Sequence, residues 1–113
     1  MTLIIVNSAP TLDLEPIELV LALAAFEQKP KLLLLEAGIF YANKYQQEKR
    51  LNGKASGRVL SALPLYDCDE VFVSRRDLEQ LSLSRDELQD FCTLINDDEI
   101  KKLIHQSKHC VNF

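Results

Sequence analysis

Three cysteines, Cys68, Cys92 and Cys110, are the side chains of this 113-residue chain best suited to covalent chemistry. A reactive thiol needs its pKa lowered by a nearby cation or a helix N-terminus. Cys68 has an aspartate on each side, and negative neighbours disfavour the thiolate. Cys92 and Cys110 lie in short apolar segments, so we expect both to pack in the core. Their odd number and the lack of a C-x-x-C pair favour reduced thiols over a disulfide framework.

A second group of reactive side chains, His105, His109 and Cys110, contains residue types that bind zinc. A structural zinc site needs four ligands, however. His105 should lie near the end of a helix, and the other two residues should begin a strand. Nothing in this spacing makes the three side chains converge. The interpretation we favour is a histidine at a helix C-terminus next to a buried cysteine.

The sequence offers little support for a phosphate, nucleotide or flavin site. It contains no P-loop and no G-x-G-x-x-G fingerprint, and the loop from Asn7 to Thr11 has no glycine. A G-x-S-x-G serine motif is absent as well. The adjacent carboxylates Asp97 and Asp98 stand at an expected helix start, where capping is the ordinary role. We therefore predict no catalytic residue, no bound cofactor and no metal.

The basic pair Arg75-Arg76 follows an expected strand, at the edge of a parallel sheet where ligands usually bind. The pair is suited either to contact with an anion or to plain solvation. We favour solvation, because a single basic pair makes only a weak patch.

The length and charge of the chain exclude several classes of protein. The 113 residues suffice for a single domain spanning residues 1–113. A net charge of -4 argues against a broad basic surface, so we expect no strong direct binding of nucleic acid. The first residues lack the positive region of a signal peptide, and no apolar run approaches the ~20 residues that span a bilayer. These features predict a soluble, cytoplasmic protein that has no contact with the membrane.

Short apolar runs predict five strands, which alternate with helices along the whole chain. The pattern indicates an α/β fold, with a mostly parallel five-stranded sheet and helices on both faces. The strands are expected at Leu3 to Val6, Leu32 to Leu35, Glu70 to Val73, Phe91 to Ile95 and His109 to Phe113.

The helices are expected between these strands. We predict them from an Asp13 cap to Phe26, from Ile39, from Arg58 to Leu63, from a Ser74 cap to Leu78, from Ser82 or Ser84, and from Asp98 to Gln106 with Asn96 or Asp97 as the cap. Ser84 to Glu87 resembles a capping box. In the last helix, Ile100, Leu103 and Ile104 are expected to share one face. The polar segment from Gln46 to Gly57 is the best candidate for a mobile loop.

One of these helices suggests an oligomer. From Ile17 to Phe26 almost every residue is apolar, whereas a helix that covers one sheet face needs only an apolar stripe. We infer that another subunit covers the second face of this helix.

Short motifs spread along the chain together resemble the DsrE/DsrF-like family, and within it the TusC/DsrF branch. The resemblance is strongest in the Leu65-Tyr66-Asp67 connector and the strand from Glu70 to Val73 that follows it. It extends to the exits of the first two strands and to the closing residues. The remaining motifs are Ser8-Ala9-Pro10, Glu36-Ala37-Gly38-Ile39-Phe40 and Val111-Asn112-Phe113.

This resemblance implies a flavodoxin-like fold and a heterohexamer, in which the chain joins TusB-like and TusD-like subunits. Such a complex passes persulfide sulfur toward 2-thiolation of the wobble uridine of tRNA, and the related DsrEFH complexes act in sulfur oxidation. The family's sulfur-carrying cysteine belongs to the TusD/DsrE subunit, just after the third strand. Here that place holds Val73 and Ser74, which cannot carry a persulfide.

The resemblance therefore favours a non-catalytic, TusC-like subunit. Two departures from the branch are the Gln46 to Gly57 loop and the Arg75-Arg76 pair, where the branch tends to be smaller and less charged. Three alternatives stay open: a subunit for sulfur oxidation, a sulfur-transfer protein acting through Cys68 or Cys110, and a homo-oligomeric ligand-binding protein.

Overall fold

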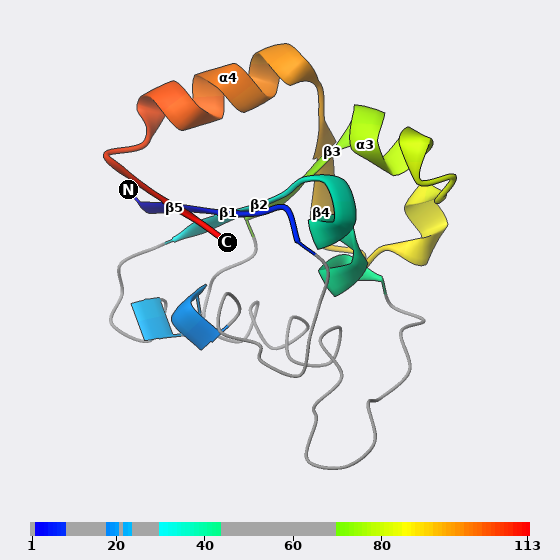
Figure 1. The fold of residues 1–113 in the computed structure, drawn as a ribbon, viewed down its shortest axis with the longest axis horizontal. Coiled ribbons are helices and arrows are strands. Elements are labelled where there is room, and N and C mark those ends of the chain that lie inside the picture. Colours follow the sequence, from blue (N-terminus) through cyan, green and yellow to red (C-terminus); the bar gives the residue numbers. More distant parts are fainter. Residues whose placement is uncertain (1, 9–17, 21, 24–29, 44–69) are drawn as a thin grey trace.

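The structure is a computed structural model, and it describes residues 2–8, 18–20, 22–23, 30–43 and 70–113. Within these residues five strands form one sheet in the order β4-β3-β2-β1-β5, and every neighbouring pair is parallel (Figure 1). The α/β fold expected from the sequence is thus confirmed. The strands are β1 (Thr2–Val6), β2 (Lys31–Leu34), β3 (Val71–Ser74), β4 (Cys92–Ile95) and β5 (His109–Asn112).

The helices differ more from expectation than the strands do. After β2 the chain forms the 3-10 helix η1 (Glu36–Ala42), which begins three residues before the helix expected at Ile39. After β3 comes α3 (Arg75–Gln80), which Ser74 caps as predicted. The next expected helix is only a single 3-10 turn, η3 (Arg85–Glu87), and its N-cap residue Ser84 makes no side-chain capping bond. The capping box predicted there is therefore wrong.

The capping box of this region lies instead at the start of α4 (Asp97–Gln106). The Asn96 side chain accepts a hydrogen bond from the Glu99 N–H at 2.8 Å, and the Glu99 carboxylate accepts one from the Asn96 N–H at 3.1 Å. Asparagine serves as well as serine at an N-cap. The reciprocal pair explains why α4 begins so sharply after β4.

The connections between strands follow from the strand order. The sheet is built stepwise from β1 to β4 in one direction, and the chain then returns past β1 to place β5. Connections between parallel strands are almost always right-handed, so steps in one direction place their helices on one face of the sheet. The returning connection must then lie on the opposite face. Figure 1 shows this arrangement, with α4 on one side of the sheet and the helical residues 18–20 and 22–23 on the other.

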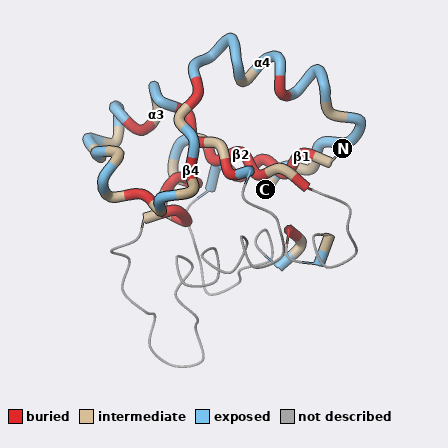
Figure 2. The backbone as a smooth tube through the Cα atoms, turned by 180° about the vertical axis from the view of Figure 1, so that it is seen from behind, coloured by how far each residue is buried: buried red, intermediate tan, exposed pale blue. Residues whose placement is uncertain are grey.

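Two apolar clusters, one on each face, confirm this division. The larger cluster joins alternate strand residues to Val20, to η1 and to side chains from α3 and the segment after η3; its members include Ile4, Val6, Leu32, Leu34, Ile39, Val71, Val73, Leu78 and Leu88. The smaller cluster lies under α4 and consists of Leu3, Ile5, Leu33, Ile95 and Leu103. Figure 2 shows buried residues along the strands and mostly exposed residues along α4.

One helix is too narrow to cover its whole face of the sheet. Five strands span roughly 20 Å, whereas a helix is only about 10 Å wide. A hollow of about 320 Å³ therefore remains beside α4, over Phe72 and Ile95. Of the three apolar residues predicted to share one face of α4, Leu103 is buried and Ile100 packs against the same cluster. Ile104, on the same side of the helix, is 39% exposed.

Several predictions concern residues outside the described part of the chain. They include most of the helix expected up to Phe26, the helix at 58–63, the loop at 46–57 and the connector at 65–69. Of the first helix, Val20 is buried in the larger cluster and Leu19 and Leu23 pack against it, while Glu18 and Ala22 are exposed. Covering of that helix by another subunit stays a prediction. Among the described helices, none has the length and apolar character needed to cross a membrane.

The turn after β2 packs against the end of β1 so closely that it requires a glycine. A Cβ added to Gly38 would lie 2.0 Å from the Val6 carbonyl oxygen and 3.2 Å from the Asn7 nitrogen. The same carbonyl accepts a hydrogen bond from the Leu35 N–H at 2.9 Å, so it cannot move away freely. Gly38 thus holds the exits of β1 and β2 together.

We predict that Gly38→Ala lowers the free energy of unfolding by about 3 kcal/mol, because backbone atoms must move to admit the methyl group. Urea denaturation of the purified chain measures this change. Ala37→Gly is the matched control, since it alters the same turn by one methyl group. It should cost no more than about 1 kcal/mol. A Gly38→Ala variant as stable as the parent would show that the two exits are not in contact.

Candidate functional site

The reversal of the chain after β4 opens a crevice at the carboxyl edge of the sheet. The chain leaves β3 toward the larger cluster and leaves β4 toward the smaller one, so α3 and α4 diverge to opposite faces. Open α/β sheets bind ligands at such a point. The crevice measures about 430 Å³ and is lined by Leu35, Glu36, Ser74, Arg76, Asp77, Asp97, Ile100 and Lys101.

Ser74 is the most deeply buried polar residue of this crevice. It ends β3 and is 1% exposed. Its hydroxyl accepts a hydrogen bond from the Asp77 N–H at 3.3 Å, which caps the first turn of α3. The residue at the strand exit therefore stabilises a helix end, and its short side chain is enclosed by the protein.

Asp77 joins α3 to the exit of β2. Its carboxylate accepts a hydrogen bond from the Glu36 N–H at 2.8 Å, across 41 positions of sequence. Glu36 has a φ of 48°, in the left-handed region that costs a residue with a side chain on the order of 1 kcal/mol. The charge-assisted bond from Asp77 offsets this strain and keeps the β2 exit in place.

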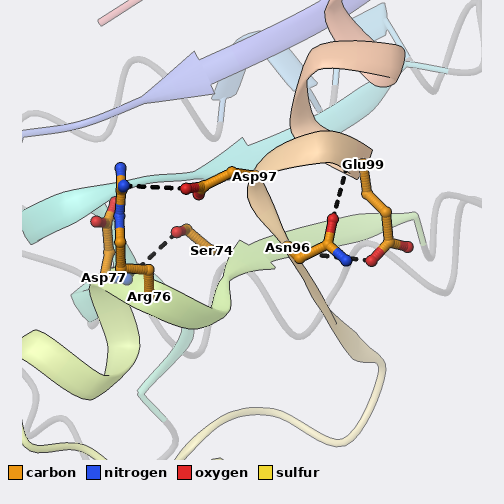
Figure 3. A network of polar contacts seen from close by, with 6 residues as sticks. All are labelled: Ser74, Arg76, Asp77, Asn96, Asp97 and Glu99. Atoms are coloured by element: carbon orange, nitrogen blue, oxygen red, sulfur yellow. Dashed lines mark hydrogen bonds and ion pairs between the residues drawn. The ribbon is translucent and has the colours of Figure 1, made fainter.

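Arg76 and Asp97 form an ion pair across the crevice, from α3 to α4. The guanidinium nitrogen and the carboxylate oxygen are 2.9 Å apart, as Figure 3 shows beside the capping bonds of Ser74 and Asn96. The two side chains are 67% and 49% exposed, so the pair contributes at most about 1 kcal/mol. Both arginines of the Arg75-Arg76 pair are exposed as predicted. Arg76 nevertheless meets an anion, which is a carboxylate of its own chain.

The charges around the crevice do not suit a phosphate group. Glu36, Asp77 and Asp97 face Arg76 and Lys101, so acidic and basic side chains are mixed. The N-termini of α3 and α4 are already capped by Ser74 and Asn96. In the described ranges, no three His, Cys, Asp or Glu side chains come together to hold a metal ion. The crevice is thus a shaped polar surface built from caps and ion pairs.

The two cysteines that the structure describes have opposite environments. Cys92 is buried at the start of β4, and this burial raises the pKa of its thiol from 9.0 to about 12. The nearby Arg85 lowers that pKa and Asp90 raises it, but both effects are smaller than that of burial. The prediction that Cys92 belongs to the core is confirmed. Cys68 lies outside the described residues.

Cys110 is exposed, so its predicted place in the core is wrong. It pairs with Leu3 of β1 and lies on the face that α4 covers. The helix shields Leu3 but does not extend over β5, the strand at the edge of the sheet. His105 and His109 are exposed as well. The sequence suggested burial because it does not reveal which strand lies at an edge.

These features define a small α/β domain whose crevice, among the described residues, contains no thiol. Comparison with known proteins identifies its family. The chain matches the model of the DsrE/DsrF-like family over residues 1–113 and belongs to that family.

Two individual proteins illustrate this relationship. The chain is 27% identical over 92 residues to a protein TusC homolog of Pseudomonas aeruginosa, which covers 81% of this chain and 77% of that protein. Its fold is similar to the crystal structure of the ychN protein from E. coli, with a TM-score of 0.85 at 17% identity. That match covers 99% of this chain and 97% of the other.

We predict that Asp77→Ala lowers the free energy of unfolding by about 2 kcal/mol, because it leaves the strained Glu36 N–H without its acceptor. Asp77→Asn keeps an acceptor oxygen and should recover most of the loss. Asp97→Ala, which breaks only the exposed ion pair, should cost less than about 1 kcal/mol. Denaturant unfolding of the three variants tests this order. Equal losses at positions 77 and 97 would contradict the role assigned to Asp77.

Thiol reactivity should follow the environments of the two described cysteines. At mildly alkaline pH, iodoacetamide should alkylate Cys110 in the native protein and leave Cys92 unmodified, because a thiol with a pKa of about 12 has almost no thiolate there. Peptide mass spectrometry before and after unfolding in urea measures this. Equal labelling of both cysteines in the native state would contradict the burial of Cys92.

Proposed function

We propose that the chain is a non-catalytic, TusC/DsrF-like subunit of a sulfur-relay complex, and that it supports transfer of persulfide sulfur for 2-thiolation of the tRNA wobble uridine. Membership of the DsrE/DsrF-like family and similarity to a TusC homolog support a sulfur-relay subunit. The specific step at tRNA is an inference from the resemblance of the sequence to the TusC branch.

The observation that carries this proposal is the position of Ser74. By resemblance to the DsrE/DsrF-like family, the sulfur-carrying cysteine belongs to the TusD/DsrE subunit and follows its third strand. In this chain the end of β3 holds a buried hydroxyl that caps α3. A persulfide needs an accessible thiolate, and this position offers neither the sulfur nor the access.

The two described thiols do not replace the missing cysteine at that position. Cys92 is buried, and its raised pKa suppresses the thiolate. Cys110 is exposed but lies on β5, three strands away from β3 in the sheet. On this proposal the sulfur carrier comes from a partner. We propose that the partners are TusB-like and TusD-like subunits in a cytoplasmic heterohexamer.

The proposed function is tested by nucleoside mass spectrometry of tRNA from a strain that lacks this chain. We expect 2-thiouridine at the wobble position to be lost and to return when the parent chain is supplied. Ser74→Ala should restore thiolation as well, because the hydroxyl acts only as a cap. Unchanged 2-thiouridine in the deletion strain would overturn the tRNA role and leave sulfur oxidation as the alternative.

A second candidate function rests on the exposure of Cys110: the chain would carry sulfur itself, through Cys110 or Cys68. A double variant, Cys68→Ser with Cys110→Ser, separates the two functions in the same strain. Full restoration of 2-thiouridine is the result expected of a non-catalytic subunit. Failure to restore it, with the folded variant present at normal abundance, would favour the cysteine-based function.

A further inference from the structure

The face of the sheet that α4 covers has a hollow over β3 and β4. These two strands lie at one side of the sheet, and α4 connects β4 to β5 at the opposite edge (Figure 1). The helix must therefore cross the sheet, and it leaves part of β3 and β4 uncovered beside it. The hollow measures about 320 Å³. It shares no lining residue with the crevice at the strand exits, so the two are separate.

The floor of this hollow is apolar and contains an aromatic ring. Phe72, Ile95 and Leu103 form it, and all three belong to the smaller cluster or pack against it. Phe72 lies on β3, an inner strand of the sheet, yet its side chain is only partly buried. A flat aromatic group of a ligand gains both apolar burial and ring contact on such a floor. The volume is at the lower end of the range for small-molecule sites, so a compact ligand fits.

The rim of the hollow is charged, and one of its charges is not balanced. Its lining includes two ammonium groups, from Lys31 and Lys102, and one carboxylate, from Glu99. The Glu99 carboxylate already accepts the Asn96 N–H at 3.1 Å, at the positive end of α4. Lys31 has the Glu70 carboxylate at 3.7 Å. In the described part of the chain no ion pair or hydrogen bond involves the Lys102 side chain, so its ammonium is the charge available to a ligand.

We propose that this hollow binds a small amphipathic anion, an aromatic carboxylate whose ring lies over Phe72 and whose carboxylate faces Lys102. The two contacts are close together, because Lys102 at the rim is the neighbour in sequence of Leu103 at the floor. A single available cation suits a monoanion better than the several charges of a nucleotide phosphate. This inference goes beyond the proposed role in sulfur transfer and does not depend on it.

The surroundings of the hollow favour a small molecule over a protein partner. A stable protein interface covers about 800 Å² on each side and has an apolar centre. Among the described residues Ile104 is the one large apolar side chain that is exposed, and the rest of the outer surface of α4 is polar or charged. The apolar surface near α4 is therefore confined to the hollow, which has room for one compact group.

Titration of the full chain with 2-naphthoate, followed by ¹H–¹⁵N NMR, tests the proposal. We expect a Kd of roughly 0.1–1 mM, because the site is open and supplies one ion pair. The largest shifts should occur at the backbone amides of Phe72, Ile95 and Leu103. 2-Naphthamide has the same rings without the charge and should bind about fivefold more weakly. An absence of saturable shifts at these amides in the low millimolar range, or equal affinity for the two compounds, would overturn the proposal.

Two adjacent lysines of α4 provide matched variants, because Lys102 lines the hollow and Lys101 lines the other crevice. Lys102→Glu should weaken 2-naphthoate binding about tenfold, since repulsion replaces attraction at the rim. Lys101→Glu makes the same change in net charge and should weaken binding less than about twofold, because salt screens the more distant charge. Each new carboxylate follows an acidic residue by three positions, so the cost to the helix is matched. Equal losses in the two variants would contradict a site at the hollow.

The aromatic floor is tested by a second pair of variants. Phe72→Leu removes the ring but keeps an apolar side chain, and it should weaken 2-naphthoate binding severalfold. Phe91→Leu is the control, because Phe91 is also partly buried but packs against the larger cluster, on the other face of the sheet. It should leave the affinity unchanged. Thermal unfolding shows that both variants are folded at the temperature of the titration, and unchanged binding to folded Phe72→Leu would contradict the assigned floor.

Discussion

The handedness of the strand connections is the constraint on which the rest of this structure depends. Three connections progress across the sheet in one direction and place their apolar residues in the larger cluster. The fourth returns past β1 and places α4 on the opposite face. This single reversal separates α3 from α4 and so opens the crevice between them. Among the described helices only α4 lies on that face, and Cys110 on the edge strand is exposed.

The residues at the crevice serve to hold three chain exits in fixed positions. Ser74 caps α3, Asp77 stabilises the left-handed Glu36, and Arg76 connects α3 to Asp97 on α4. Each of these side chains already has a partner within the chain. A polar surface that has no thiol among its described residues is suited to positioning a partner, which is the role proposed for this subunit.

Much of the fold could be predicted from the sequence, because it depends on local patterns. Short β-branched and leucine-rich runs identified all five strands to within a residue or so, and Ser74 was recognised as a cap from its place before a polar turn. The helices were harder to predict from the sequence than the strands. Ser84 has the spacing of a capping box but begins only one 3-10 turn, because the chain must soon enter β4. Asn96 was one of the two residues expected to cap α4, which is confirmed, but the return bond from Glu99 that completes the box was not predicted.

The candidate site was predictable only in part. Arg75-Arg76 was placed correctly at the functional edge of the sheet, but the partner of Arg76 comes from α4, and only the strand order brings that helix near. The link between Asp77 and Glu36 crosses 41 positions and involves an unusual backbone angle. Neither the long-range bond nor the backbone angle can be recognised from neighbouring residues in the sequence. The burial of Cys110 was misjudged for the same reason, since an edge strand and a central strand have similar composition.

The central claim is that sulfur passes through a partner of this chain and never resides on the chain itself. The most direct measurement is intact-mass spectrometry of the complex isolated from cells, with persulfides trapped by an alkylating reagent that retains the transferred sulfur. We predict that this chain carries only directly alkylated thiols and that a partner subunit carries the trapped persulfide. A trapped persulfide on Cys68 or Cys110 of this chain would contradict the account.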